Sequence, residues 1–398
     1  MLFENQQLTY YNVPETEQFL NQILLKVAKL FRAIFPMEQT AALILIGNYG
    51  RGEGGVVKID GVYRPYNNLE LLYIHHGHIH PKEIEMIHRR LKQLSERYGI
   101  GIDFSAVNKN RLLSLQGLVL SYDIRFGHKT LLGDSTFLKK YEKFSLHNIA
   151  PTKMRQLLIN RGVLLLINRL LLNKEVLSTD EKKLIIKHAM KAIIAYGDTL
   201  LYFHNCYHWS YAQKQFNMTQ LPGVNSGIKS LYTKAILFHF MPDDRDYLNR
   251  DLHQWHDELL EQLSTIHLMC EQIYLDDPTL QWENYATRSL EKMSHTHKSF
   301  RQNLQSSLYG LYHIKLLKKY HSPAQVVNFM QMGHRGMLEL IFPYIAYQDP
   351  TNDHLSLLQT ALHTKERTRN NFVKSFLKRW AKWEDSYVND LLKSDDLF

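Results

Sequence analysis

The chain has 398 residues, of which 44% are hydrophobic and 22% charged, a composition typical of a folded globular protein rather than a disordered one. The length is sufficient for two domains, each with its own core. The formal charge of +9 favours acidic partners such as nucleotide phosphates, nucleic acid or a membrane surface. The two cysteines, Cys206 and Cys270, argue against a disulfide framework and predict a reducing, cytoplasmic setting.

Neither a membrane span nor a signal peptide is expected. The longest apolar run, residues 162–172, is shorter than the ~20 residues that a span requires, and it contains Asn168 and Arg169. We interpret this run as a buried helix. The first residues, MLFENQQLTYYN, lack the basic stretch followed by an apolar core that marks an export signal.

The first part of the chain mixes helix and strand patterns. Apolar residues at helical spacing predict a helix over residues 15–35, and Pro36 ends it. The run AALILI at 41–46 is too short for a helix and predicts a strand buried on both faces. Further along we expect an extended segment at 56–63 with a turn at Asp60-Gly61, a strand at 69–74, a helix from Pro81 to Gly99, a strand at 101–107, and one or two short strands within 117–132.

After Pro151 the pattern becomes helical, with no convincing strand. The predicted fold is therefore α+β, with a small mixed-sheet domain at residues 1–145 and an all-α domain at 146–398. In an alternative, the helical domain consists of two bundles with a break near 278–298. The helical segments are expected at 152–174, 181–205, 226–240, 248–275, 300–321, 335–347 and 368–393.

The glycine-rich segment after the first predicted strand is the best candidate for an anion site. Glycine allows backbone amides to approach a ligand closely and to adopt positive φ, and successive amides of this kind bind anions. An arginine inside the turn is suited to clamp a phosphate. The candidate phosphate-binding residues are Gly47, Asn48, Gly50, Arg51 and Gly52, and Gly54 and Gly55 continue the run.

Three oxygen-bearing side chains are candidate metal ligands. Alternation along the strand at 69–74 places Asn68 and Glu70 on one side, and Asp103 lies on a neighbouring predicted strand. Carboxylates suit Mg²⁺, which is usually held by one or two of them together with phosphate oxygens and water. In phosphoryl or nucleotidyl transfer, such ions stabilise the attacking and leaving oxygens. Glu70 and Asp103 are thus the candidate catalytic residues.

This order of a strand, GNYGRGEGG, NNLELL, a helix and GIDFSAV resembles the nucleotidyltransferase core shared with DNA polymerase β, in particular minimal bacterial domains of the GRGEG type followed by helices. The resemblance covers roughly residues 40–135. Gly47 matches the family's first glycine, Glu70 its second acid and Asp103 its third. It implies Mg²⁺ or Mn²⁺ as cofactor and a nucleoside triphosphate, with ATP favoured, as substrate.

The chain departs from the family pattern at two positions. Asn48 stands where the family has serine or glycine, and Asn68 stands where the family has its first aspartate. An amide oxygen can ligate Mg²⁺ but brings no negative charge. The first hypothesis is a nucleotidyltransferase that acts on a hydroxyl of a protein, an RNA or a small molecule. The second is a related domain that binds a nucleotide or partner without turnover.

Histidines offer weaker metal candidates. Residues 75–80, HHGHIH, hold four histidines, but the spacing fits neither a helical pair nor a zinc finger, so we favour a polar strand end and turn. His204 and His208 are expected at i, i+4 on a helix of the second domain, where Tyr207 suggests an aromatic packing patch. On the same predicted helix, Lys191 and Asp198 are candidates for contacting the acceptor.

The last predicted helix combines an aromatic face with basic residues. Phe372, Phe376, Trp380 and Trp383 recur at helical spacing among lysines and an arginine. We favour a terminal helix that packs its aromatic face into the helical core. The alternative is a surface for an acidic partner, which gives a third hypothesis: a helical interaction protein that binds RNA, lipid or another protein.

Overall fold

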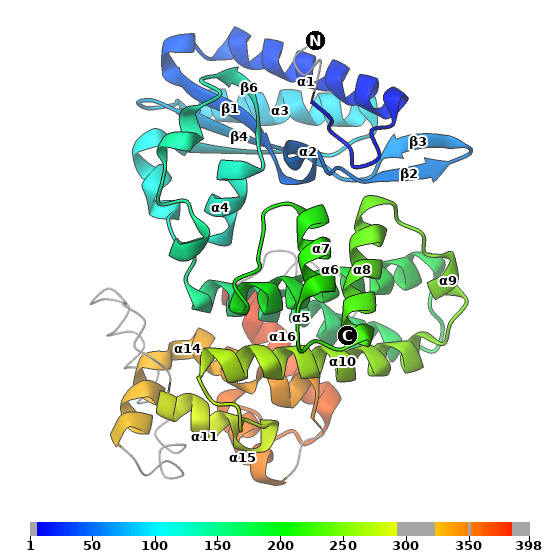
Figure 1. The fold of residues 1–398 in the computed structure, drawn as a ribbon, viewed down its shortest axis with the longest axis vertical. Coiled ribbons are helices and arrows are strands. Elements are labelled where there is room, and N and C mark those ends of the chain that lie inside the picture. The colour runs from blue at the N-terminus through cyan, green and yellow to red at the C-terminus, as the bar shows by residue number, and fades with distance from the viewer. Residues whose placement is uncertain (1–5, 293–322, 349–351, 384–398) are drawn as a thin grey trace. The chain divides into compact units, whose positions relative to one another are not determined.

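The computed structural model describes residues 6–292, 323–348 and 352–383 (Figure 1). The protein is mixed α/β and mostly helical, with a small mixed sheet in its N-terminal part, in agreement with the α+β prediction. The chain divides into two compact units, residues 1–154 with 205–243, and residues 155–204 with 244–398. The first unit therefore takes in a helical segment, 205–243, that lies beyond the predicted mixed-sheet region.

A four-stranded sheet with the order β5-β4-β1-β6 forms the centre of the first unit. β1 is antiparallel to both β4 and β6, whereas β4 and β5 are parallel. The parallel pair is joined by helix α3, as a parallel connection requires a crossover. The elements are β1 (Thr40–Ile46), β4 (Leu69–His75), α3 (Pro81–Tyr98), β5 (Ile102–Asn108) and β6 (Lys129–Gly133).

A two-stranded hairpin, between β1 and β4 in chain order, extends beyond one end of the sheet (Figure 1). It consists of β2 (Val56–Ile59) and β3 (Val62–Pro65), and it confirms the extended segment and turn predicted there. Asp60 and Gly61 at its tip both have positive φ, 50° and 83°. That combination forms the tight hairpin turn which matches the twist of paired strands.

Apolar side chains cover both faces of the sheet. Helices α1 (Pro14–Ile34) and α3 pack on the face that carries Leu43 and Leu45. The opposite face, which carries Ile44, is covered by Ile124 of α4 and by irregular segments around it. The remaining short elements of this part are η1 (Met37–Gln39), α2 (Gly47–Arg51), η2 (Lys109–Leu115), α4 (Val119–Phe126), η3 (Phe137–Lys140) and η4 (Leu146–Asn148).

Two helices of segment 205–243 complete the first unit, namely α7 (Tyr211–Gln220) and α8 (Ser226–Phe240). The rings of Tyr10 and Phe240 stack, with centroids 3.8 Å apart, and so join the end of α8 to the N-terminal segment. α8 was predicted from its apolar spacing. α7 was not, because its sequence YAQKQFNMTQ has only two buried positions, Lys214 and Met218.

The second unit is helical throughout its described residues. Phe372, Phe376 and Trp380 of its last described helix are fully buried, so the predicted aromatic face does pack into the unit's core. The predicted helix at 300–321 lies outside the described residues. The unit contains α5 (Pro151–Leu172, from Arg155 on), α6 (Thr179–Phe203), α9 (Arg245–Leu248), α10 (Leu252–Tyr274), α11 (Trp282–Lys292), α14 (Pro323–Ala346), α15 (Asn352–Ala361) and α16 (Arg369–Trp383).

One or two short strands were expected within residues 117–132, and one is present, β6 at residues 129–133, whereas residues 119–126 form helix α4, whose Ile124 packs against the sheet. One local prediction was wrong. His204 and His208 do not share a helix. α6 ends at Phe203, and Asn205 adopts a positive φ of 58° that stops it.

None of the helices in the described ranges is long and apolar enough to cross a membrane. The run at 162–172 forms the buried C-terminal half of α5, as predicted. Both cysteines are free thiols, and Cys270 is buried.

Candidate functional site

Glu70 and Asp103 lie side by side at one end of the sheet. They are directly paired in the parallel register of β4 and β5, so their side chains leave the same face. Glu70 is also paired with Ile46, the last residue of β1. The fold thus brings the two carboxylates together at the point where β1 enters the glycine turn, as the sequence predicted.

Gly47, the first residue of the turn, lies against the Glu70 carboxylate. Its φ is +66°, and a Cβ atom placed there would be only 2.3 Å from Oε1 of Glu70. Any side chain at position 47 would therefore displace the carboxylate as well as strain the backbone. This contact is the physical reason why Gly47 and Glu70 belong to one site.

The environment of Glu70 disfavours its negative charge. The pKa of Glu70 is raised, mainly by burial of its carboxyl group. The positive charge of the nearby Arg51 lowers this pKa, and the negative charge of Asp103 raises it further. Two neighbouring carboxylates with one of them partly buried create a site that gains from a cation. Asp103 itself is exposed at the edge strand β5.

Asn68 completes the predicted set, but as a hydrogen-bond donor. Its Nδ2 donates to Oδ2 of Asp103 at 3.1 Å. A Cβ at Gly101 would lie 2.3 Å from the amide oxygen of Asn68, so the side chain rests against that glycine. The amide nitrogen of Asn68 thus satisfies one carboxylate oxygen of Asp103 and brings no negative charge to the site.

The residues present fit one Mg²⁺ or Mn²⁺ ion, by the chemistry of the donors. Mg²⁺ is commonly bound through one or two carboxylates with phosphate and water completing the shell, and Glu70 and Asp103 supply two. Across residues 6–292, 323–348 and 352–383, no three His, Cys, Asp or Glu side chains group as a metal site would. The described residues therefore do not form a metal site in which the protein supplies every ligand.

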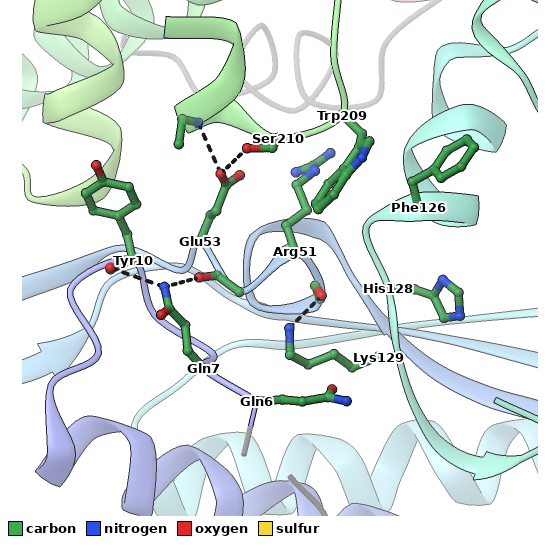
Figure 2. Close-up of a pocket in the computed structure, with 13 residues that line it drawn as sticks. Gln6, Gln7, Tyr10, Arg51, Glu53, Phe126, His128, Lys129, Trp209 and Ser210 are labelled. Atoms are coloured by element: carbon green, nitrogen blue, oxygen red, sulfur yellow. Dashed lines mark hydrogen bonds between the residues drawn. The ribbon is translucent and has the colours of Figure 1, made fainter. Parts of the chain in front are cut away.

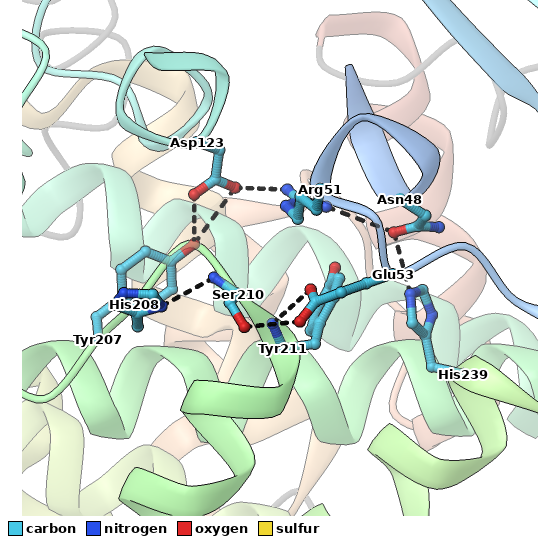
Figure 3. Close-up of polar contacts among 9 residues, drawn as sticks. All are labelled: Asn48, Arg51, Glu53, Asp123, Tyr207, His208, Ser210, Tyr211 and His239. Carbon is cyan, nitrogen blue, oxygen red and sulfur yellow. Dashed lines mark hydrogen bonds and ion pairs between the residues drawn. The ribbon is translucent and has the colours of Figure 1, made fainter. Parts of the chain in front are cut away.

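Arg51, predicted to clamp a phosphate, makes contacts within the protein. Its Nη2 is 2.8 Å from Oδ2 of Asp123 on α4, and its guanidinium lies 5.1 Å from the ring centroid of Tyr211 (Figure 3). Tyr207 also donates to Asp123, at 3.2 Å. Although burial opposes it, Asp123 raises the pKa of Arg51, so the charge persists in this buried pair.

Asn48 is contacted from the helical segment. Its Oδ1 lies 3.0 Å from Nε2 of His239 on α8, and Nη1 of Arg51 approaches the same oxygen at 3.4 Å. Figure 3 shows His239 and Arg51 reaching Asn48 from two sides. The side chain of Asn48 is therefore held in place, directly after the glycine that touches Glu70.

Glu53 binds the start of α7. The buried carboxylate accepts hydrogen bonds from Oγ of Ser210 at 2.6 Å and from the backbone amides of Tyr211 at 2.8 Å and Ala212 at 3.1 Å. A carboxylate is favourable at a helix N-terminus, where amides are otherwise unsatisfied. Both charged residues of the GRGEG segment thus attach residues 205–243 to the sheet domain.

Gly50 and Gly52 pack closely in the second half of the turn. A Cβ at Gly50 would lie 2.5 Å from the carbonyl oxygen of Leu45, and Gly52 has a φ of +78°. The carbonyl of Gly50 accepts a hydrogen bond from Nζ of Lys129 at 3.0 Å. These glycines and Lys129 line a pocket of about 500 Å³ (Figure 2).

The histidine and acceptor candidates have other roles or belong to other elements. His80 accepts from the backbone amide of Lys82 and so caps α3, which agrees with the favoured strand end and turn. Burial lowers the pKa of His75. Lys191 and Asp198 are on α6, a helix of the second unit, where Asp198 is buried.

Several residues of the site escaped sequence reasoning. Asp123, Lys129 and His239 come from elements far along the chain, and no local pattern marks them. Glu53 did carry a signal, because a carboxylate inside a glycine-dense turn needs a partner. Comparisons of the chain with models of protein families, with curated proteins and with solved structures found no match.

Proposed function

We propose that the protein is a metal-dependent nucleotidyltransferase that moves a nucleoside monophosphate from a nucleoside triphosphate, ATP favoured, to a hydroxyl of a protein, an RNA or a small molecule. The observation that carries the proposal is the pairing of Glu70 and Asp103 in register beside Gly47. In this proposal, residues 1–145 form a nucleotidyltransferase-like domain, which the helical residues 146–398 follow.

Each residue of the pair has a distinct role in the proposal. Glu70, partly buried and with a raised pKa, is the group that gains most from a bound Mg²⁺ or Mn²⁺. Asp103 is exposed and oriented by Asn68, so it is the better placed to accept a proton from an incoming hydroxyl. When bound, the metal would neutralise phosphate charge.

In the proposal, the glycine turn positions the phosphate and adds little positive charge to the site. Gly47 permits close approach of the backbone to a phosphate beside Glu70. Because Arg51 is paired with Asp123, it would act on a phosphate through its electrostatic field rather than by a direct bidentate contact. Asn48, fixed by His239, presents its amide at the start of the turn.

A second candidate function is nucleotide binding without turnover. It is favoured by Asn68, whose amide hydrogen bonds Asp103 and leaves the site with two carboxylates. A cytoplasmic location, in line with the two free thiols, is part of both proposals. A contact between an acidic partner and the exposed Lys378 and Lys382 of α16 stays a separate prediction.

The test is incubation with α-labelled ATP, GTP, CTP and UTP and Mg²⁺ or Mn²⁺, with label followed in the protein itself, in added RNA and in small-molecule extracts. We expect transfer that falls at least about 100-fold in Glu70→Gln and in Asp103→Asn, since each removes a charge from the metal site. Glu85→Gln, on the exposed side of α3, is the matched control and should leave transfer intact.

The nucleotide-induced rise in melting temperature separates the two candidates. Stabilisation without transfer of label would establish the binding function, and a gain of transfer in Asn68→Asp would show that the site lacks only the third charge. If no nucleotide raises the melting temperature with either metal, both candidates are wrong.

A further inference from the structure

The pocket behind the glycine turn is a separate feature of the first unit. Its volume of about 500 Å³ is in the range of small-molecule sites. It is formed by the N-terminal segment, the turn, the end of α4, the start of β6 and the loop before α7, and Gln6, Lys129, Phe126 and Trp209 are among the residues that line it (Figure 2).

Among the described residues that line this pocket, one lysine lacks a counter-ion. Arg51 is paired with Asp123, and Glu53 is satisfied by the start of α7. Burial lowers the pKa of His128, which is therefore neutral at pH 7. Within the described part of the chain, Lys129 has no carboxylate at ion-pair distance, and its single hydrogen bond goes to the carbonyl of Gly50.

Lys129 is disfavoured as a cation where it lies. Burial lowers its pKa to about 8, although Glu17 of α1 and Glu53 oppose the shift from a distance. At pH 7 the ammonium group is still mostly protonated and retains two hydrogens that Gly50 does not use. A negative group placed in the pocket would relieve the cost of this buried charge.

The rim of the pocket offers flat apolar surface. Phe126 is 45% exposed as a residue, although its side chain is large and apolar, and the Arg125 guanidinium lies 5.0 Å from its ring centroid. Trp209 lies against Gly127, where a Cβ atom would be 3.0 Å from the indole. An exposed phenyl ring and a half-buried indole beside a cavity are suited to stack a planar ligand.

We propose that this pocket binds a small molecule that carries one carboxylate on a flat ring, with the carboxylate on Lys129 and the ring against Phe126 and Trp209. A single cation matches a single negative charge. Both amide hydrogens of Gln7 are already used, by the carbonyls of Tyr10 and Gly52, so this side chain offers no donor to a phosphate dianion.

The Lys129 side chain leaves the sheet on the other face from the carboxylate pair. Lys129 is paired with Leu45, whose side chain belongs to the face covered by α1. Glu70 is paired with Ile46, whose side chain belongs to the opposite face. The two sites share the glycine turn, but Lys129 and Glu70 leave opposite faces, so Glu70→Gln should leave Lys129 in place and the carboxylate preference intact.

The experiment is ligand-observed NMR on the full chain with benzoate, 2-naphthoate and indole-3-carboxylate, with the corresponding carboxamides as neutral probes. We expect the carboxylates to bind and the carboxamides to bind at least about tenfold more weakly. Lys129→Met should weaken carboxylate binding at least about tenfold, whereas Lys143→Met, an exposed lysine of the same unit, should not.

Two further variants make the result decisive if Lys129→Met folds poorly. Lys129→Arg keeps the charge and should retain the preference for the carboxylate, and Phe126→Ala should weaken the larger rings more than benzoate. Affinity should fall as the pH rises above 8, because the lysine loses its proton while the carboxylate stays ionised. Equal binding of carboxylate and carboxamide, absence of binding by all three carboxylates, or affinity unchanged in Lys129→Met would each overturn the proposal.

Discussion

At the scale of single residues, the contact between Gly47 and Glu70 shows how the turn and the acid depend on each other. The glycine is required twice, by its positive φ and by the carboxylate that occupies the space of a side chain. The cost of the first requirement is about 1–2 kcal/mol for an L-residue in the left-handed region. The second is a steric cost that exists only while Glu70 is present.

Gly47→Ala is therefore expected to lower the free energy of unfolding by more than about 2 kcal/mol. Gly77→Ala is the matched control, since Gly77 has a φ of +65° but no atom within 4 Å of the position that a Cβ would take, and it should lose only the backbone part. Urea unfolding measures both. In a Glu70→Ala background the difference between the two alanine variants should disappear, and its persistence would show that the contact is unimportant.

At the scale of elements, Glu53 and α7 form a helix cap between distant parts of the chain. α7 begins after Ser210, whose Oγ accepts from the amide of Gln213 and donates to Glu53. The Glu53 carboxylate then accepts hydrogen bonds from the backbone amides of Tyr211 and Ala212. The free amides of the first turn of α7 thus find their acceptor in a distant part of the chain. This explains why a short, polar helix is formed at all.

Glu53→Ala is expected to lower the free energy of unfolding by about 2–3 kcal/mol, because charge-assisted hydrogen bonds are lost and buried donors lose their acceptor. Amide exchange in α7 should increase more than in β1. Glu142→Ala, an exposed glutamate of the same unit, should change stability by less than about 0.5 kcal/mol. Similar losses in the two variants would contradict a capping role.

At the scale of the whole molecule, the second unit has its own buried polar centre. Nε of Arg155 lies 2.6 Å from Oε1 of Glu271, and Arg155 also donates to Tyr285 at 3.2 Å. Both charged side chains are almost completely buried, which is costly unless they pair. Burial of Glu271 acts to raise its pKa, but the charge of Arg155 outweighs this effect, and the pKa of Glu271 is lowered to about 2.

Arg155→Met is expected to destabilise the second unit by about 3–5 kcal/mol, since it removes the guanidinium partner of the buried Glu271 carboxylate and leaves it, among the described residues, only the contact with His267 at 3.5 Å. Amide exchange followed by segment should rise in α10 and α11 and stay low in β1 and β4 of the first unit. The surface pair Lys174–Glu181, at 2.7 Å, gives the control, and Lys174→Met should cost less than about 1 kcal/mol. Equal loss of protection in β1 would mean that the two units unfold together.

The sequence by itself determined the elements whose pattern is local. Apolar spacing predicted α1, α3 and most helices after residue 151, and turn residues predicted the hairpin at Asp60-Gly61. Alternation and order also placed Glu70 and Asp103 near the glycine turn. These predictions succeeded because helical period, strand period and turn chemistry are properties of neighbouring residues.

Only the tertiary structure decided what those residues contact. Arg51 carries a charge that a free turn would offer to a phosphate, yet Asp123, 72 residues later, pairs with it. Segment 119–126 alternates like a strand but forms a helix, because burial of Ile124 against the sheet decides its conformation. Likewise, the partners of Glu53, Asn48 and Lys129 are set by packing between distant segments, which no local periodicity records.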